Sequence, residues 1–121
     1  MGKVYGYCRT AFADEEEIIK RTELIKKYCE DNGLTLEKCF CDNGVNGFDI
    51  GEGFKQLMGE LENEDVIVLR DPSQLSRSNA RLQMLFKQFA DMAVEIVYVS
   101  EKEVHTPSIA EWVEKRLARR N

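Results

Sequence analysis

The sequence predicts an α/β protein of three layers, in which a mostly parallel sheet of four to five strands is covered by helices on both faces. Three observations predict this fold. Short apolar runs alternate along the chain with longer segments whose apolar residues recur at helical spacing. The run at residues 66–69 is continuously apolar, as in strands that are buried on both faces. Alternation of strand and helix requires crossover connections, which place helices against a parallel sheet.

The first half of the chain begins with a short apolar strand, expected at residues 4–7. A helix is expected over residues 14–32, where apolar residues recur at helical spacing. Asp14 is a candidate N-cap, and Glu17 stands three residues later, as in a capping box. Gly33 supplies a C-terminal stop, so we expect this helix to be bounded at both ends.

The middle of the chain continues the alternation. A second strand is expected at residues 36–41, and a loop that contains several glycines follows over residues 42–53. Residues 54–62 are expected to form a helix, because four apolar residues share one face: Phe54, Leu57, Met58 and Leu61. The apolar run at residues 66–69 is the third strand, and a polar segment follows it at residues 70–79.

The last third is expected to hold two helices and a strand. Residues 80–92 form a helix with an apolar face of Leu82, Leu85, Phe86 and Phe89, and residues 94–99 form the fourth strand. We expect one domain over residues 1–105. Residues 106–121 are expected to start a C-terminal helix of the dimerisation type, whose capping box is Ser108 and Glu111. Its apolar face would pack on the domain or on a partner helix, through Ile109, Trp112, Val113 and Leu117.

The composition is that of an ordinary globular protein, with 43% hydrophobic and 32% charged residues. No apolar run approaches the roughly 18 residues that cross a bilayer, and the N-terminus has no secretion signal. We therefore expect a cytoplasmic protein with no membrane contact. The formal net charge of −5 argues against DNA binding by charge alone. Basic residues are concentrated at residues 114–120, as either a solvated helix end or a DNA-contacting segment.

The four cysteines are Cys8, Cys29, Cys39 and Cys41, and the one histidine is His105. None of them forms the paired spacing of a zinc site. Cys39 and Cys41 are two apart on an expected strand, so they share a face, and we expect them to act as small hydrophobic side chains. Free thiols fit a reducing compartment. We therefore expect no metal site and no cofactor.

Functional groups in parallel sheets gather at the carboxyl ends of the strands. These ends are expected at residues 9–13, 42–47, 70–77 and 100–103. The candidate site is therefore placed by the topology, before any motif is considered.

The segments at these strand ends form recognisable motifs. Residues 7–11 read Tyr-Cys-Arg-Thr-Ala, and residues 42–47 read Asp-Asn-Gly-Val-Asn-Gly. Residues 51–54 read Gly-Glu-Gly-Phe, and residues 71–78 read Asp-Pro-Ser-Gln-Leu-Ser-Arg-Ser. In order and spacing they resemble the motifs Tyr-x-Arg-Val-Ser, Asp-x-Gly-x-Ser-Gly, Arg-Pro-Gly-Leu/Phe and Leu-Asp-Arg-Leu-Ser-Arg-Ser of the N-terminal catalytic domain of serine recombinases, the resolvases and invertases. The resemblance spans residues 4–103 and implies a resolvase-like fold.

The resemblance implies a serine that attacks a DNA phosphate and forms a phosphoserine link, with arginines that stabilise the transferring phosphoryl group. The arginine of the first motif is Arg9, and the last arginine is Arg77. The nucleophile position is Ala11, which has no side-chain oxygen. Arg9, Ala11 and Arg77 are therefore the candidate catalytic positions. Alternatively, the two arginines are retained for structure and pair with Asp42 or with backbone carbonyls.

Other positions also depart from the motifs. Gly51 and Gln74 stand where the family has arginines, and Ser73 stands where it has an aspartate. Asn46 replaces the loop serine, whereas the loop aspartate is present as Asp42 and is expected to play a supporting role. The candidate phosphate-binding or DNA-binding set is therefore Arg9, Arg77, Asp42, Ser73 and Gln74.

Neighbouring hydroxyls are the candidates to replace the missing nucleophile. Thr10 is adjacent, but side chains alternate along a strand, so Thr10 should face away from the side of Ala11. Ser73, Ser76 and Ser78 are expected to serve as loop and helix-cap hydroxyls. We therefore expect no rapid DNA cleavage.

Three functions remain open. The first is a serine recombinase-like domain, associated with site-specific recombination or integration, that no longer cleaves DNA and works by association. The second is an active strand-exchange enzyme, or an engineered Ser-to-Ala fragment of one. The third is a standalone protein–protein interaction module on the same fold. The resemblance implies DNA as a partner, contacted through segments beyond this chain, and homodimers, tetramers or association with an active recombinase. The chain stops within the expected last helix, which favours a fragment of a longer protein.

Overall fold

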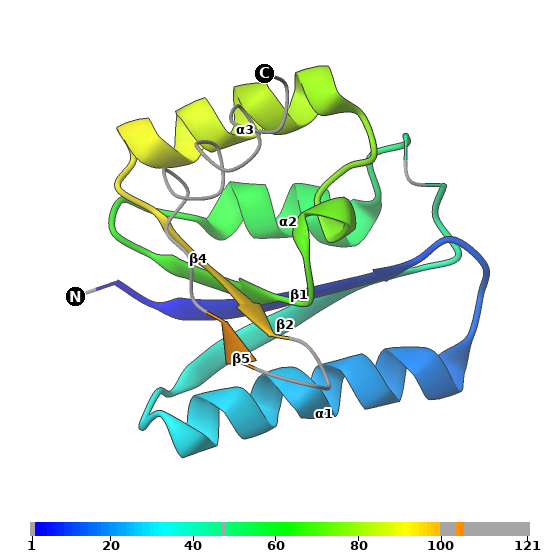
Figure 1. Cartoon of the computed structure of the whole chain (residues 1–121), viewed down its shortest axis with the longest axis horizontal. Coiled ribbons are helices and arrows are strands. Elements are labelled where there is room, and N and C mark those ends of the chain that lie inside the picture. Colours follow the sequence, from blue (N-terminus) through cyan, green and yellow to red (C-terminus); the bar gives the residue numbers. More distant parts are fainter. Residues whose placement is uncertain (1, 47, 100–103, 106–121) are drawn as a thin grey trace.

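A computed structural model describes residues 2–46, 48–99 and 104–105. Strands and helices alternate as the sequence predicts (Figure 1). In chain order the elements are β1 (Val4–Thr10), α1 (Glu15–Asp31), β2 (Leu36–Asn43), α2 (Glu52–Glu60), β3 (Val66–Leu69), the 3₁₀ helix η1 (Pro72–Gln74), α3 (Asn79–Asp91), β4 (Glu95–Val99) and β5 (Val104–His105).

The strands form one sheet in the order β2-β1-β3-β4-β5. Strand β1 pairs in parallel with β2 and β3, and β3 pairs in parallel with β4. Only β5 is antiparallel to its neighbour, through the pairs Tyr98 with His105 and Val99 with Val104. The predicted mostly parallel sheet is therefore confirmed, with five strands among the described residues.

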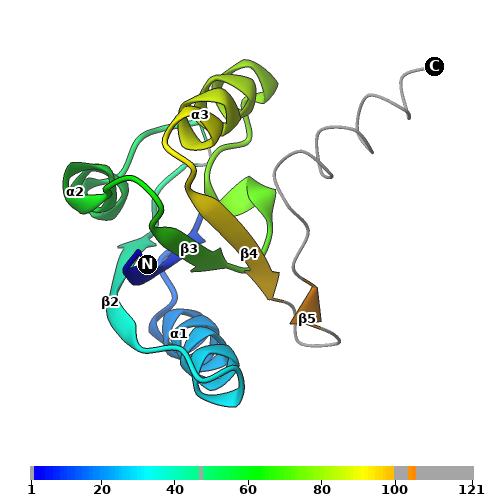
Figure 2. The same cartoon turned by 90° about the vertical axis from the view of Figure 1, so that its left-hand side faces the viewer.

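Helices cover both faces of the sheet, which confirms the three layers. Helix α1 lies on one face, and α2 and α3 lie on the other, as the two views show (Figures 1 and 2). Side chains of β1 alternate between two apolar clusters: Tyr5 and Tyr7 pack with α2 and α3, whereas Val4 and Cys8 pack with α1. Both faces of this central strand are therefore buried, which explains its apolar sequence.

Strand β1 extends three residues beyond its expected end at residue 7. Its last residues continue the parallel register with β2, with Arg9 opposite Asp42 and Thr10 opposite Asn43. These polar residues are buried nonetheless. The prediction ended the strand at residue 7 because polar residues follow. In the folded protein, pairing with β2 extends the strand to Thr10.

Helix α2 begins at Glu52, two residues before its expected start. The carboxylate of Asp42 accepts hydrogen bonds from the backbone N–H groups of Gly53 at 2.7 Å and Phe54 at 2.9 Å. The first N–H groups of a helix have no partner within the helix. A carboxylate from a neighbouring strand thus starts this helix, and the apolar periodicity of the helix itself does not reveal it.

The capping box predicted for α1 is half formed. Asp14 caps the helix by accepting a hydrogen bond from the N–H of Glu17 at 3.1 Å. The second bond of a capping box, from the N–H of Asp14 to the Glu17 side chain, is not formed. The N–H of Asp14 donates instead to Oδ1 of Asn43 at 2.8 Å, and the Glu17 carboxylate pairs with Arg21. Gly33 follows the helix with a φ of +67°, a conformation that favours glycine, so the predicted stop is confirmed.

The polar segment at residues 70–79 contains the short helix η1. Asp71 caps it by accepting from the N–H of Ser73 at 2.9 Å, and Pro72 occupies its first turn. The predicted C-terminal helix at residues 106–121, with Trp112, lies outside the described residues. Among the helices that are described, none is long and apolar enough to cross a membrane.

Candidate functional site

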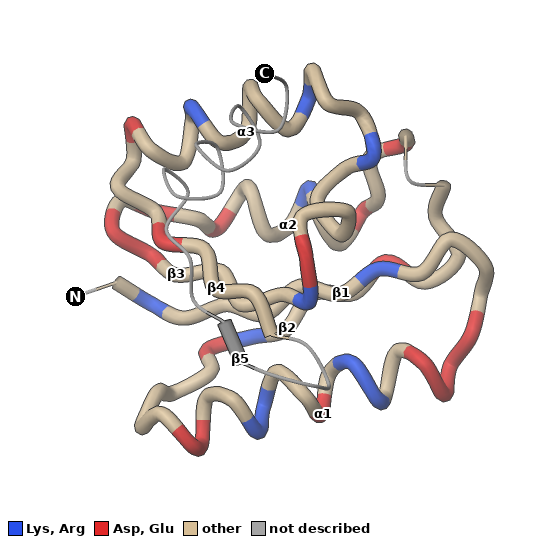
Figure 3. The backbone as a smooth tube through the Cα atoms, viewed as in Figure 1, with Lys and Arg blue, Asp and Glu red and all other residues tan. Residues whose placement is uncertain are grey.

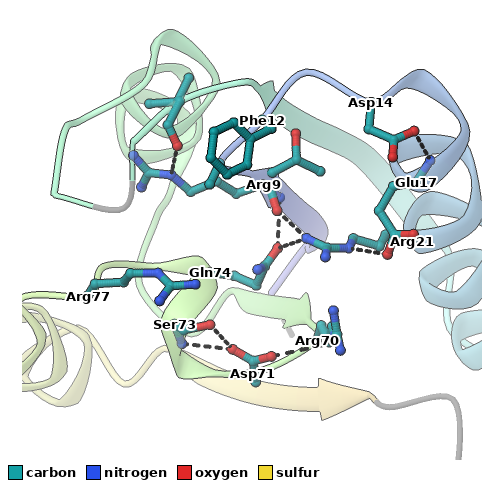
Figure 4. Close-up of a pocket in the computed structure, with 13 residues that line it drawn as sticks. Arg9, Phe12, Asp14, Glu17, Arg21, Arg70, Asp71, Ser73, Gln74 and Arg77 are labelled. Carbon is teal, nitrogen blue, oxygen red and sulfur yellow. Dashed lines mark hydrogen bonds and ion pairs between the residues drawn. The ribbon is translucent and has the colours of Figure 1, made fainter.

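A cleft of about 520 Å³ lies at the carboxyl ends of β1 and β3, where the topology places functional groups. Its walls come from the end of β1 and the residues after it, from the first turns of α1, and from the segment after β3 (Figure 4). The lining residues are Arg9, Thr10, Ala11, Phe12, Asp14, Glu17, Arg21, Val45, Arg70, Asp71, Ser73, Gln74 and Arg77.

Arg9 lines this cleft, but its guanidinium is committed to the loop after β2. Nη2 donates to the carbonyl oxygens of Asn46, at 2.6 Å, and of Asp49. Nε donates to the carbonyl oxygen of Val45 at 3.4 Å. The side chain is only 4% exposed. Arg9 therefore anchors the loop at Val45, Asn46 and Asp49, as in the alternative in which the arginine is retained to bind backbone carbonyls.

Gln74 stands where the resemblance places an arginine, and its amide joins β1 to α1. Oε1 accepts hydrogen bonds from the backbone N–H of Arg9 at 2.8 Å and from Nη1 of Arg21 at 3.3 Å. Arg21 also donates to the carbonyl oxygen of Arg9 and pairs with Glu17 at 2.9 Å. Figure 4 shows this network across the floor of the cleft. An acceptor oxygen is required at position 74, which an arginine could not supply.

Ala11 follows β1 directly and is exposed at the cleft. Its methyl group offers neither a nucleophile nor a hydrogen bond. The neighbouring Phe12 is 87% exposed and also lines the cleft. An apolar pair therefore occupies the place where the resemblance implies the reacting hydroxyl.

The hydroxyl of Thr10 is fully engaged with β2 and the loop that follows it. Oγ1 donates to Oδ1 of Asn43 at 2.7 Å and accepts from the N–H of Gly44 at 3.0 Å. Although Thr10 contributes to the cleft wall, its oxygen supports the turn at Asn43. It is not free to attack a phosphate.

The three serines also have structural partners. Oγ of Ser73 donates to Oδ1 of Asp71. Ser76 is fully buried, and its Oγ accepts from the N–H of Ser78 at 3.0 Å. Ser78 caps α3 by accepting from the N–H of Arg81 at 3.3 Å. These contacts agree with the expected roles of the serines in loops and helix caps.

Arg77 differs from Arg9 because its side chain is exposed and, within the described part of the chain, makes no hydrogen bond or ion pair. Arg70 is also exposed, and its Nε lies 3.7 Å from Oδ2 of Asp71. Both guanidinium groups line the cleft. They are therefore the cations that an anion in the cleft could reach with the least disruption of the fold.

Asp42 lies outside the lining of the cleft, and its carboxylate faces α2. In addition to the N–H groups of α2, it accepts a hydrogen bond from the hydroxyl of Tyr7 at 2.5 Å. Burial raises the pKa of Tyr7 above its usual value, and the bond to Asp42 raises it further. A Cβ atom at Gly51 would lie 2.2 to 2.4 Å from the Asp42 carboxyl group. An arginine, or any other side chain, at position 51 would therefore collide with the Asp42 carboxyl group where it now lies.

The cleft is mixed in charge. Four arginines line it together with three carboxylates, those of Asp14, Glu17 and Asp71. Figure 3 shows the same mixture over the rest of the described chain, where no helix has basic residues alone. The field that attracts a phosphate to this cleft is therefore weak, in accordance with the net charge of −5.

The cleft brings together five of the residues expected from the sequence: Arg9, Ala11, Ser73, Gln74 and Arg77. It excludes Asp42 and adds Arg21, Arg70 and Phe12, which sequence reasoning missed as site residues. The position of Arg70 directly after β3 was a usable signal. The four-residue spacing of Glu17 and Arg21 was another, because it places the pair on one side of α1.

Comparisons with known proteins agree with this architecture. A family model described as "Resolvase, N terminal domain" matches residues 4–118. No curated protein sequence matches the chain significantly.

Several solved structures share the fold. The N-terminal catalytic domain of TP901-1 integrase is 21% identical with a TM-score of 0.78, over 97% of this chain and 92% of that one. A resolvase family site-specific recombinase from Streptococcus pneumoniae is 17% identical with a TM-score of 0.69, over 98% and 87%. The C-terminal catalytic domain of ISC1926 TnpA, an IS607-like serine recombinase, is 20% identical with a TM-score of 0.65, over 96% and 78%. At these identities the likeness establishes the fold.

Proposed function

The chain belongs to the resolvase N-terminal domain family, and from that premise we propose a serine recombinase domain that takes part in DNA recombination by association and does not itself cleave DNA. The observation that supports this most strongly is Ala11, which places a methyl group at the nucleophile position on the wall of the cleft. Neighbouring hydroxyls do not replace it, because those of Thr10 and Ser73 are bound to Asn43 and Asp71.

The cationic groups support the same conclusion. Arg9 is bound to loop carbonyls, and Gln74 and Gly51 stand where the family motifs have arginines. Each lost contact to the charge of a transition state is worth about 3 kcal/mol. Two lost arginines would therefore slow phosphoryl transfer by about four orders of magnitude, even with a hydroxyl in place.

DNA and other recombinase subunits are the partners we propose. Arg77 and Arg70 could contact a phosphate weakly, while most affinity for DNA would come from segments beyond this chain. The domain would form homodimers or tetramers, or associate with an active recombinase. We place it in the cytoplasm, where its four free thiols would persist.

Covalent protein–DNA adducts test the proposal. The unmodified chain and an Ala11→Ser variant are each incubated with supercoiled DNA, and adducts are separated on denaturing gels. We expect no adduct from the unmodified chain and at most a trace from Ala11→Ser, because Gln74 and Gly51 remain. An adduct from the unmodified chain would overturn the proposal in favour of an active enzyme with a shifted site. Abundant adducts from Ala11→Ser would show that only the hydroxyl was missing.

Association is tested separately by sedimentation velocity over a range of concentrations, alone and with an active serine recombinase. Dimers, tetramers or mixed complexes are expected. A strict monomer at high concentration in both experiments would remove association as the function and favour a binding module unrelated to recombination.

A further inference from the structure

Three thiols lie together between the sheet and α1. In the parallel register Cys8 of β1 stands opposite Cys41 of β2, and their Sγ atoms are 2.8 Å apart. Cys39 lies two residues earlier on β2 and faces the same side. All three Sγ atoms lie within 4.8 Å of one another, and no disulfide joins them.

Gly6 makes room for this cluster. It stands opposite Cys39 in the register, and a Cβ atom at Gly6 would lie 2.9 Å from Sγ of Cys39. The missing side chain lets the Cys39 thiol lie over the backbone of β1, next to Cys8. The hydroxyl of Thr22, on α1, closes the cluster from above, 3.6 Å from Sγ of Cys8 and 3.7 Å from Sγ of Cys41.

We propose that Cys8, Cys39 and Cys41 bind one soft, thiophilic cation through three sulfur ligands. Thiolates select cations such as Cu(I) and Zn(II) over harder ions. A metal–sulfur distance of about 2.3 Å places the sulfurs of a planar three-ligand site about 4 Å apart. The cluster reaches that geometry when the close pair Cys8 and Cys41 separates by roughly 1 Å, a rotamer-scale adjustment.

The two cations differ in what they require. Three sulfurs suffice for Cu(I), whereas Zn(II) usually takes four ligands, so it would add the Thr22 hydroxyl or a water molecule. In either case each bound thiol loses its proton to solvent as its sulfur–metal bond forms, and no electron is transferred. The spacing of the cysteines in the sequence gave no sign of this site, because one ligand comes from a different strand.

The position of the cluster allows an ion to enter. Strand β2 is at the edge of the sheet, and Cys39 and Cys41 are half-buried, whereas Cys8 is fully buried. A bound ion would join β1 to β2 one residue before Arg9 and Asp42. It would therefore stabilise the fold to the extent that it binds the folded chain more tightly than the unfolded chain.

The test uses the reduced chain without oxygen, titrated separately with Cu(I) buffered by a competing chelator and with Zn(II). Native mass spectrometry counts the bound ions and the protons released. We expect one ion per chain in at least one titration, and the ion that binds identifies the cation. Loss of binding by at least tenfold is expected in Cys39→Ala and Cys41→Ala, with unchanged binding in the matched control Cys29→Ala. Cys29 is a buried thiol of the same layer that lies outside the cluster.

Gly6→Ala adds a test that retains all three thiols, and its added methyl group should weaken binding by displacing Cys39. Circular dichroism confirms that each variant is folded before it is titrated. The proposal is overturned by failure of both cations to bind, or by equal binding in Cys29→Ala and the cluster variants.

Discussion

The backbone N–H of Arg9 donates a hydrogen bond to Oε1 of Gln74 at 2.8 Å, which fixes the end of β1 to the turn of η1. Gln74 is buried, and the same oxygen also accepts from Arg21. The side chain that stands in place of a family arginine is thus part of the fold of this site. Reintroducing an arginine would remove the acceptor and bring two guanidinium groups together.

Gln74→Arg is therefore expected to lower the free energy of unfolding by about 1 to 3 kcal/mol, because a buried N–H loses its partner. Chemical denaturation measures the change. Gln74→Glu is the matched control, since it retains an acceptor oxygen beside Arg21, and it should cost less than Gln74→Arg. Equal stability of Gln74→Arg and the parent chain would contradict the structural role of this glutamine.

The close approach of Gly51 to Asp42 predicts the effect of a substitution at position 51. An added Cβ at position 51 would meet the Asp42 carboxyl group at 2.2 to 2.4 Å and displace it from the start of α2. Gly51→Ala should lower the free energy of unfolding by about 1 to 3 kcal/mol.

Gly59 in the same helix provides the control, because a Cβ there meets nothing within 4 Å. Gly59→Ala should raise stability by up to about 1 kcal/mol. Thermal melts of the two variants should therefore shift in opposite directions. An unchanged or raised melting temperature in Gly51→Ala would show that the Asp42 carboxylate can move without cost.

Arg9 and Arg77 are expected to differ in what their removal changes. Arg9→Ala frees three loop carbonyls and should destabilise the fold by about 1.5 to 3 kcal/mol, as for hydrogen bonds to charged groups. Arg77→Ala removes an exposed side chain and should alter stability by less than about 0.5 kcal/mol.

The two arginine variants are also compared in their binding to a short DNA duplex at low salt. Arg77→Ala should weaken whatever binding the domain has and reduce its salt dependence, because a phosphate contact is lost. If Arg77→Ala leaves DNA binding unchanged while Arg9→Ala abolishes it without loss of stability, the roles assigned to the two arginines are wrong.

Two buried tyrosines predict the stability of the protein in alkali. Burial raises the pKa of Tyr7, with a further rise from its bond to Asp42, and burial raises the pKa of Tyr98. Both phenols must therefore stay neutral in the folded state, at pH values where an unfolded phenol ionises, above its usual pKa of 10.0. The contribution of these two phenols to stability should be fully present below pH 10 and be lost as the pH rises above it.

Phenylalanine variants separate the two tyrosines at neutral pH. Tyr7→Phe should cost about 1 kcal/mol or more, because Asp42 loses a buried donor. Tyr98→Phe should be neutral or stabilising, since the Tyr98 hydroxyl is buried and has no partner in the described part of the chain. Each variant should also show a weaker loss of stability above pH 10. A slope that is unchanged in both would exclude these phenols as the cause.

The amino-acid sequence is enough to predict the layers, the parallel sheet and the edge of the sheet at which the cleft lies. These follow from periodicity and alternation, which are local properties of the chain. Five of the residues named from the motifs line the cleft, because the motifs follow the strand ends. Most helices and strands begin and end within two residues of the predicted positions, because periodicity along a segment is a local property.

The contacts of those residues follow from the three-dimensional fold. Three contacts each join segments more than 10 residues apart: the binding of Arg9 to carbonyls of the loop after β2, the capping of α2 by Asp42, and the contact of Cys8 with Cys41. The register in which β1 pairs with β2 brings Cys8 opposite Cys41 and Arg9 opposite Asp42. The return of the chain from β2 into α2 brings the start of the helix to the Asp42 carboxylate. The pattern of residue types along one segment predicts which side chains are buried. The pairing of strands and the packing of helices determine which residues those side chains contact.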